Sequence, residues 1–281
     1  MTVLVTGARG GVGRRVLDRL HTAGHTVRAS SRTPAELSVP DGVDVRRLDL
    51  NSPDTFEAAL HGVDKVFLYA EAEGAKEFFA AAHGAGVRHI VLLSSSTVEG
   101  PDAAADPLAR HHAVVEDALA ASALPSTVLR PGAFAGNALG WSHAIRGGQP
   151  VELPYADAHT APVHEDDIAD VAAAALTGEA FTGRTLTLTG PRSLTFREQL
   201  AVLAELLGRE IPVRELTREQ AVEGMGRFMP APVLTSLLAQ WAAAVGKPAA
   251  TTGTVRDVTG RPGRTFRQWA GENLGAFAAQ D

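Results

Sequence analysis

Cysteine, long apolar runs and an excess of basic residues are all missing from this sequence of 281 residues. The absence of cysteine excludes disulfide bonds, thiolate nucleophiles and thiolate metal sites, and it leaves the redox compartment undetermined. No apolar run approaches the roughly 20 residues that a membrane helix needs. The net charge is -6 and the basic residues are spread along the chain, so no electrostatic footprint for nucleic acid or anionic lipid is visible.

These absences favour a soluble protein of the cytoplasm. A basic leader followed by an apolar stretch does not precede the first predicted strand, residues 2–5, which argues against a signal peptide. We expect a small-molecule substrate, no direct contact with nucleic acid or membrane, and a monomer or homodimer.

Strand and helix patterns alternate regularly through the first half of the chain. The expected strands are residues 2–5, 25–30, 43–49, 64–70, 87–95 and 126–130, and the expected helices are residues 12–23, 55–60, 74–85 and 107–122. Strands separated by helices of this length predict βαβ crossovers and a parallel sheet with helices on both faces. The fold class is therefore α/β, with a Rossmann-type doubly wound parallel sheet.

The pattern changes after Pro131 to loops rich in glycine and proline. We expect a nucleotide-binding domain over residues 1–150 and a smaller mixed α/β substrate-binding lobe over residues 151–281, with residues 163–190 contributing partly back to the first domain. Strands are expected near residues 150–153 and 184–188, and amphipathic helices over residues 196–207 and 218–227. Thr195 and Thr217 are candidate N-caps, with Glu198 as the capping-box partner of Thr195.

The segment TGARGGVG, residues 6–13, places Gly7, Gly10 and Gly13 directly after a strand and directly before a helix. Gly7 permits the tight turn, Gly10 or Gly11 lets the backbone approach a pyrophosphate, and Gly13 allows the helix to pack closely on the strand. The helix N-terminus then faces the negative charge. This context favours a dinucleotide site over a glycine turn that binds nothing.

The end of the second strand indicates which dinucleotide binds. NAD-binding folds usually carry an acidic residue there, whose carboxylate binds the ribose 2′-hydroxyl. Here the strand ends in Ser31 and Arg32, which can accept a 2′-phosphate with help from Arg9, so we predict NADP(H). The alternative is that Arg32 is only a solvated charge. Asp49 and Leu50 follow the third strand, where adenine contacts are common, although Asp49 is equally suited to a helix N-cap region.

These segments, together with LDLNSPDTF, IVLLSSS and LPSTVLRPGAF, resemble the atypical short-chain dehydrogenase/reductases, and within them the NmrA-like group. The resemblance continues through PVHEDDIADVAAAAL, GRTLTLTGPRSLTFREQLAVLAELLGR and TGRPGRTFRQWAGENLGAF, and so covers nearly the whole chain. It implies an NADP(H)-binding lobe, a C-terminal substrate lobe, and a cleft between them. In that cleft, Ser94 and the run Pro131, Gly132, Ala133 and Phe134 would lie near the nicotinamide.

The sequence departs from the family at its catalytic motif. Catalytic members carry Tyr-x-x-x-Lys, in which the Tyr is the general acid and the Lys lowers its pKa. The corresponding segment here is LARHHAVVE, which places Leu108 at the tyrosine position and His112 at the lysine position when Glu116 is aligned with the family's following Glu. The only tyrosines, Tyr69 and Tyr155, do not have the spacing to replace it.

His112 is our candidate for a general acid or base, or for a hydrogen-bond donor to ribose and substrate, because imidazole titrates near neutrality. Its neighbour His111 is an alternative, and either residue is equally typical of a polar helix face. Ser94 and Ser96 end the fifth strand at the carboxyl edge of the sheet, where they could orient a carbonyl. No Gly-x-Ser-x-Gly elbow surrounds them, which argues against a serine hydrolase.

The predicted site combines these candidates. Its catalytic residues are His112, Ser94 and Ser96, and its cofactor-binding residues are Thr6, Gly7, Arg9, Gly10, Gly11, Val12, Gly13, Ser31, Arg32, Asp49, Leu50, Tyr69, Ala70, Ser94, His112, Pro131, Gly132, Ala133 and Phe134. No metal is predicted, because the cluster from His164 to Asp167 opens a helix, where acids cap amides and complement the dipole. The residues that could line an apolar substrate pocket, or belong to the core, are Phe134, Trp141, Met225, Phe228 and Met229, and for Met225 and Phe228 we favour the core.

Three functions are compatible with these features. The first is an NADPH-dependent reductase of a small, largely apolar carbonyl, quinone or enone, which needs little from a general acid. The second, suggested by the NmrA resemblance, is a non-catalytic regulator that senses NADP(H) and binds a protein partner. The third is a biosynthetic isomerase or lyase that uses the same cleft.

Overall fold

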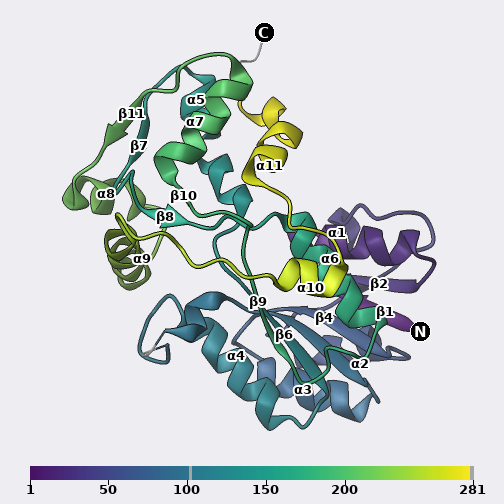
Figure 1. Cartoon of the computed structure of the whole chain (residues 1–281). Helices are drawn as coiled ribbons and strands as arrows, with labels where there is room; N and C mark the ends of the chain where they lie inside the picture. Colours follow the sequence, from purple (N-terminus) through teal and green to yellow (C-terminus); the bar gives the residue numbers. More distant parts are fainter. Residues whose placement is uncertain (101–102, 279–281) are drawn as a thin grey trace.

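The computed structural model describes residues 1–100 and 103–278 (Figure 1). Its central sheet has the strand order β3-β2-β1-β4-β5-β6-β9, and every pairing in it is parallel. The strands are β1 (Thr2–Val5), β2 (Thr26–Ser31), β3 (Asp44–Arg47), β4 (Lys65–Tyr69), β5 (His89–Leu93), β6 (Ser126–Pro131) and β9 (Thr185–Leu188). The order reverses between β1 and β4, and this switch point is where open α/β sheets bind their ligands. The predicted Rossmann-type fold is confirmed.

Helices cover both faces of this sheet. Helices α1 (Gly11–Thr22) and α6 (Glu165–Thr177) pack on the face that receives Val3 and Val5 of β1, whereas Leu4 points to the opposite face. That opposite face is covered by α2 (Phe56–Leu60), α3 (Ala75–Gly84) and α4 (Arg110–Ala121). Because side chains alternate along a strand, a strand buried on both faces needs apolar residues at every position. This requirement explains the continuous apolar runs in β1, β4 and β5.

A second lobe stands above the carboxyl edge of the sheet (Figure 1). Its strands are β7 (Val151–Leu153), β8 (His159–Thr160), β10 (Leu194–Thr195) and β11 (Val213–Glu215), which pair as β7 with β11 and β8 with β10. Its helices are α5 (Ser142–Arg146), α7 (Phe196–Leu207), α8 (Arg218–Met225), α9 (Ala231–Ala244) and α11 (Phe266–Glu272). The short 3-10 turns of the chain are η1 (Pro34–Glu36), η2 (Pro53–Thr55), η3 (Ser96–Glu99), η4 (Ala135–Trp141) and η5 (Leu274–Ala276). The buried ring of Trp269 lies in the apolar cluster of this lobe.

The chain crosses between the lobes more than once. Strand β9 pairs with β6, so residues 185–188 complete the main sheet. After α9 the chain returns to α10 (Thr254–Thr259), whose Val255 belongs to the same apolar cluster as α6. Among residues 1–100 and 103–278, no helix combines the length and the apolar character that crossing a bilayer requires.

Most predicted elements form within a few residues of the expected bounds. Thr195 caps α7 in a capping box with Glu198, as predicted, and Thr217 caps α8 together with Gln220. The helix predicted over residues 107–122 begins later, at Arg110. Helices α9, α10 and α11 were not predicted, although α11 carries a capping box of its own that starts at Thr265.

Candidate active site

The glycine-rich turn between β1 and α1 has the geometry that a dinucleotide requires. Gly7 has a φ of +64°, a left-handed conformation that favours glycine, and its carbonyl accepts the amide of Gly10 over 2.8 Å. A Cβ atom on Gly13 would lie 2.3 Å from the carbonyl oxygen of Gly7, so α1 packs on the turn in a way that only glycine allows. Helix α1 begins at Gly11, and its N-cap Gly10 offers no side chain to the first amides. These amides and the helix dipole suit a pyrophosphate.

A cavity of about 640 Å³ lies beside this turn, over the ends of β1, β2 and β4; we call it the first cavity. The predicted residues that line it are Thr6, Gly7, Arg9, Ser31, Arg32, Asp49, Leu50, Tyr69 and Ala70. The lining residues that the sequence did not suggest as cofactor contacts are Ala8, Ser30, Thr33, Glu36, Leu48, Asn51, Leu68 and Glu71. His111, the alternative to His112, also lines this cavity. Gly10, Gly11, Val12 and Gly13 do not line the cavity, and the side chain of Val12 is buried in the core. This elongated surface fits the adenosine half of a dinucleotide.

One end of the first cavity carries opposed charges. Arg9 donates to Glu36 over 2.8 Å and to the hydroxyl of Thr33 over 3.0 Å. The hydrogen bonds from Thr33 and Arg9 hold the pKa of Glu36 below its usual range. Among the residues that the structure describes, the exposed Arg32 makes no hydrogen bond or ion pair. Arg32 is therefore the available cation at this end, whereas Arg9 is already engaged.

A small cavity of about 100 Å³ follows the first one along the edge of the sheet. It is lined by Tyr69, Leu93, Ser94, Ser95, His112, Pro131, Gly132 and Phe134, and Tyr69 lines the first cavity as well. His112 stands in the first turn of α4, and its Nδ1 is buried without a hydrogen-bond partner. Burying a ring nitrogen without a partner costs less free energy when it is a bare acceptor than when it carries a proton, because a buried N–H loses the hydrogen bond that it makes to water. We assign the ring proton to Nε2 for this reason.

Burial lowers the pKa of His112, and the charge of His111 lowers it further, while Glu116 opposes both effects. The imidazole is therefore neutral at pH 7. A neutral ring with its proton on Nε2 is a hydrogen-bond donor, not a source of a mobile proton. Of the two roles predicted for His112, this environment favours the donor.

The two predicted catalytic serines lie in different surroundings. Ser94 donates its hydroxyl to Glu116 over 2.5 Å, and Glu116 is held by Arg130 over 2.6 Å and 3.1 Å. The proton of Ser94 is thus committed to a carboxylate beneath the small cavity. Ser96 lies instead on the wall of the next cavity.

A large cavity of about 670 Å³ lies between the sheet edge and the second lobe. Its lining residues are Ser95, Ser96, Thr97, Leu108, Gly132, Ala133, Asn137, Trp141, Leu153, His159, Thr160, Ala161, Thr189, Phe196, Met225, Met229, Leu237, Gln240, Trp241, Ala244, Ala249 and Ala250. Ser95 and Gly132 also line the small cavity, so the large cavity adjoins the small one, which in turn shares Tyr69 with the first cavity. Leu108, at the tyrosine position of the family motif, faces this space.

The five residues suggested for an apolar pocket separate in the structure. Trp141, Met225 and Met229 line the large cavity, and Phe134 lines the small one. Met225 also packs in a small apolar cluster with α9, so it belongs both to the core and to the wall of the large cavity. Phe228 is 90% exposed, which makes the prediction of a core position wrong for this residue. It lies in the connection from α8 to α9, where helical spacing no longer applies.

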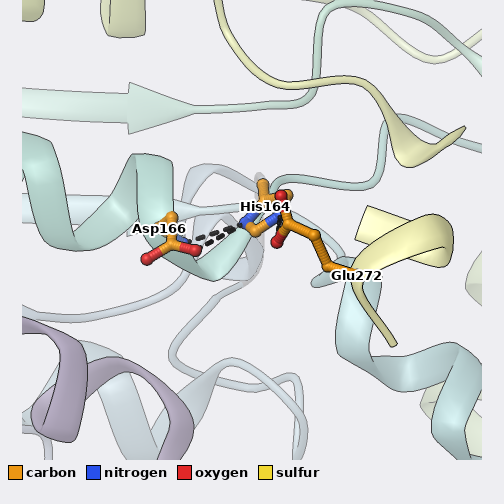
Figure 2. A group of neighbouring side chains, drawn as sticks. All are labelled: His164, Asp166 and Glu272. Atoms are coloured by element: carbon orange, nitrogen blue, oxygen red, sulfur yellow. Dashed lines mark hydrogen bonds and ion pairs between the residues drawn. The ribbon is translucent and has the colours of Figure 1, made fainter. Parts of the chain in front are cut away.

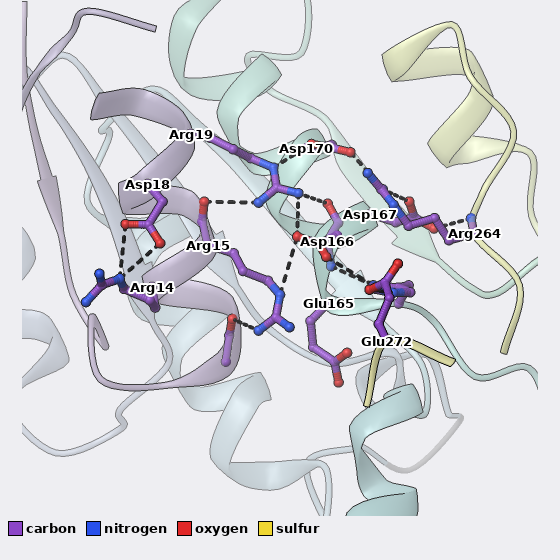
Figure 3. Close-up of polar contacts among 12 residues, drawn as sticks. Arg14, Arg15, Asp18, Arg19, Glu165, Asp166, Asp167, Asp170, Arg264 and Glu272 are labelled. Carbon is purple, nitrogen blue, oxygen red and sulfur yellow. Dashed lines mark hydrogen bonds and ion pairs between the residues drawn. The ribbon is translucent and has the colours of Figure 1, made fainter. Parts of the chain in front are cut away.

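The acidic cluster at the start of α6 is a network of ion pairs. Figure 2 shows His164 between Asp166 and Glu272: its Nε2 lies 3.1 Å from the Glu272 carboxylate, and its Nδ1 accepts the amide of Asp166. Figure 3 shows Asp166, Asp167 and Asp170 facing arginines of α1 and of the C-terminal segment, with Asp166 2.5 Å from Arg19. The carboxylate of Glu165 instead accepts the amide of Gly136 over 2.8 Å. Burial alone would raise the pKa of Asp166, but Arg19 outweighs it and the pKa lies below its usual value.

Asp167 and Asp170 of the same helix both bind Arg264, which ties the C-terminal segment to the first lobe. A cation at His164 and Asp166 would have to compete with Arg15 and Arg19. This cluster therefore joins α1, α6 and the C-terminal segment, and its carboxylates lie in the first turn of α6, where they complement the helix dipole.

The parallel sheet, the glycine-rich turn at its switch point and the row of cavities define a dinucleotide-binding protein. Residues 7–179 match the model of a family described as NAD(P)H-binding. The chain is 40% identical over 283 residues to the (4-alkanoyl-5-oxo-2,5-dihydrofuran-3-yl)methyl phosphate reductase of Streptomyces griseus, across 99% of this chain and 100% of that protein. The chain therefore belongs to the NAD(P)H-binding family, and the predicted class of NAD(P)H-dependent oxidoreductase is confirmed.

Solved structures show the same fold. The NADPH complex of a quinone oxidoreductase from Escherichia coli superposes with a TM-score of 0.82 at 24% identity, over 98% of this chain and 99% of that one. A variant of NmrA superposes with a TM-score of 0.78 at 19% identity, over 99% of this chain and 96% of that one. At these identities the two likenesses establish the architecture alone.

Proposed function

We propose that this protein is an NADPH-dependent reductase of small, largely apolar conjugated carbonyl compounds, such as enones and quinones. The observation that carries the proposal is the row of three neighbouring cavities, each of which shares lining residues with the next. The first fits the adenosine of a dinucleotide, the small one lies where the resemblance places the nicotinamide, and the large one adjoins it with mainly apolar walls. A substrate in the large cavity would meet the small cavity at Ser95 and Gly132.

The first cavity supports NADPH as the cofactor. The amides at the start of α1 would bind the pyrophosphate, and the unengaged guanidinium of Arg32 would bind the 2′-phosphate, with Ser31 as a hydroxyl donor. Bound NADPH supplies a hydride. His112 would donate Nε2–H to a hydroxyl of the nicotinamide ribose, which is a role that a neutral imidazole can fill at any pH near 7.

The missing phenol favours conjugated substrates. When a hydride adds to the far carbon of an enone, the negative charge is delocalised onto the carbonyl oxygen, and water can supply the final proton. A simple ketone would form an alkoxide and would need a strong acid at the position that Leu108 occupies. The name of the Streptomyces griseus relative describes a ring double bond beside two carbonyl groups, which is an activated enone of this kind.

The large cavity argues for an uncharged substrate over a phosphate ester. Among its described lining residues there is no lysine or arginine, the side chains that proteins most often use for phosphate. Its polar groups are hydroxyls, amides and the imidazole of His159, which suit carbonyl oxygens. We therefore extend the likeness to the Streptomyces griseus enzyme only as far as the reaction class.

The test is NADPH oxidation by the purified protein with a panel of enones, quinones and simple ketones, followed through the NADPH absorbance. We expect turnover with enones and quinones and none with simple ketones. His112→Ala should lower kcat/KM by about 3- to 10-fold, as expected for one lost neutral hydrogen bond to the ribose, while the exposed His143→Ala should not change it.

Two other outcomes would overturn the proposal. Tight NADPH binding without turnover, together with capture of a specific protein partner, would indicate a cofactor-sensing regulator. A product formed without any change in cofactor oxidation would indicate an isomerase or lyase.

A further inference from the structure

His159 is the one ionisable side chain among the described residues that line the large cavity. The remaining lining groups are apolar side chains, hydroxyls, amides and glycine. His159 stands on the two-residue strand β8 and is half-buried. A single titratable ring in a mainly apolar space of about 670 Å³ is the kind of isolated polar group that fixes the orientation of a ligand.

Hydrogen bonds hold this ring in a defined orientation. Its Nδ1 lies 3.1 Å from the hydroxyl oxygen of Ser193, which also accepts the amide of Ala249 over 2.8 Å. The Ser193 oxygen already accepts one hydrogen bond, so we assign its own proton to the contact with Nδ1 of His159 and the ring proton to Nε2. No described residue accepts a hydrogen bond from Nε2.

The walls around His159 strengthen any hydrogen bond that it makes. Trp141, Phe196 and Trp241 form a continuous aromatic group in the same cavity, with ring centroids 6.1 Å and 5.2 Å apart. Apolar walls exclude water, and a hydrogen bond to a developing negative charge is worth more where water is excluded.

We propose that His159 binds the carbonyl oxygen of the substrate through Nε2–H and stabilises the negative charge that this oxygen gains during reduction. This assignment rests on the reductase function proposed above. In this assignment, His159 of the second lobe stabilises the carbonyl oxygen in place of the missing family tyrosine, and it lies far in sequence from Leu108. Ser193 is a positioning residue, because it acts through His159.

The reaction balances with the groups named. The hydride adds to the carbon β to the carbonyl and the cofactor becomes NADP⁺, while the electron pair of the C=C bond moves to give an enolate. His159 donates a hydrogen bond to the enolate oxygen and keeps its proton. Water then supplies the proton at the α carbon, and hydroxide is neutralised by solvent.

The experiment compares four variants of the full-length protein with an acyl butenolide as the enone and menadione as the quinone. His159→Leu should lower kcat with the butenolide by about 100-fold, because one preorganised donor to an oxyanion contributes on this scale. His159→Gln keeps an N–H donor and should recover part of the loss. Ser193→Ala should lower kcat by about 3- to 10-fold, as expected for a positioning hydrogen bond of average strength. His143→Leu is the matched control, because this histidine is exposed and does not line the cavity.

Binding separates this proposal from the reductase function. Calorimetry with acetylbutyrolactone, a lactone with two carbonyl oxygens and no C=C bond, measures recognition without turnover in the presence of NADP⁺, which has no hydride to donate. We expect weaker binding to His159→Leu, with NADPH affinity and thermal unfolding unchanged. If the wild-type protein turns over and His159→Leu equals it in both kcat and lactone binding, the assignment to His159 is wrong and the reductase function stands. If the wild-type protein binds the lactone through His159 but reduces neither probe, the reductase function fails and the binding site remains.

Discussion

The cofactor end and the substrate end of the cleft are built by different means. The first cavity is lined by residues 6–9 of the glycine-rich turn and by short stretches at the ends of β2, β3 and β4, with His111 of α4 as the one more distant residue. The large cavity is assembled from side chains of many separate segments, from Ser95 to Ala250. A local motif can specify the first kind of site, whereas the second kind exists only after the chain has folded. The glycine turn constrains what the cofactor can be, and the second lobe is free to vary with the substrate.

The largest expected effect is at the glycine turn, where the two ends of the cleft should respond differently. In Gly13→Val, the new Cβ would lie 2.3 Å from the Gly7 carbonyl, so α1 must move away from β1. We expect NADPH binding to be lost in calorimetry and the unfolding free energy to fall by several kcal/mol, roughly 3 or more. Gly84→Ala is the matched control, because its Cβ would enter open space on α3. Should Gly13→Val bind NADPH normally, the close packing of α1 would not matter for the site.

The sequence predicted the first cavity better than the large cavity, for the same physical reason. The βα alternation and the glycine spacing are local patterns, and together with the family resemblance they led to the sheet and to half of the residues that line the first cavity. The pairing of Arg9 with Glu36 joins residues 27 positions apart, and nothing in the local sequence signals it. His159 and Ser193 are 34 positions apart, so their contact depends on the pairing of β8 with β10.

Helix α9 was missed for a different physical reason. Its sequence is rich in alanine and leucine with only a few polar positions, and its N-cap, Pro230, makes no side-chain hydrogen bond. Neither an amphipathic period nor a cap therefore marks it. The Thr265 and Gln268 capping box of α11 is a signal that the sequence did contain.

The next largest expected effect is the dependence of stability on pH, which we attribute to His89 in the main sheet and not to a residue of the cleft. Burial first, and then the charge of Lys65, lower the pKa of His89 from 6.5 to about 4. Its Nε2 lies 3.0 Å from the hydroxyl of Thr127, which itself donates to a backbone carbonyl, so the ring is neutral with Nε2–H as the donor. The unfolded chain binds a proton on this residue below pH 6.5, whereas the folded protein does so only near pH 4. Stability is therefore complete above pH 6.5 and falls as the pH drops toward 4.

The loss that this one residue causes is at most about 3 kcal/mol, since one pKa unit corresponds to about 1.4 kcal/mol. Urea unfolding at pH 7, 5.5 and 4.5 measures it. His89→Gln should show a flatter dependence on pH over this range, and the exposed His83→Gln should follow the wild-type protein. If the unfolding free energies of all three proteins depended on pH equally, the loss of stability in acid would be due to the protonation of groups other than His89.

The smallest expected effect lies at the charged end of the first cavity. Here a side chain, not the backbone, decides which cofactor binds, so this end resembles the large cavity in the way that it selects its ligand. Arg32→Ala should weaken NADPH binding by about 10-fold and leave NADH binding unchanged, since a guanidinium recognises the 2′-phosphate through charge-assisted hydrogen bonds.

Glu36→Gln should strengthen NADPH binding by about 2- to 5-fold, because it frees Arg9 and removes a carboxylate that would repel the phosphate. Glu152→Gln, which breaks an exposed ion pair with Arg214 outside the first cavity, is the control. If Arg32→Ala weakened NADH and NADPH equally, Arg32 would contribute only general charge, and selectivity for the phosphorylated cofactor would have to come from Ser31 and Thr33.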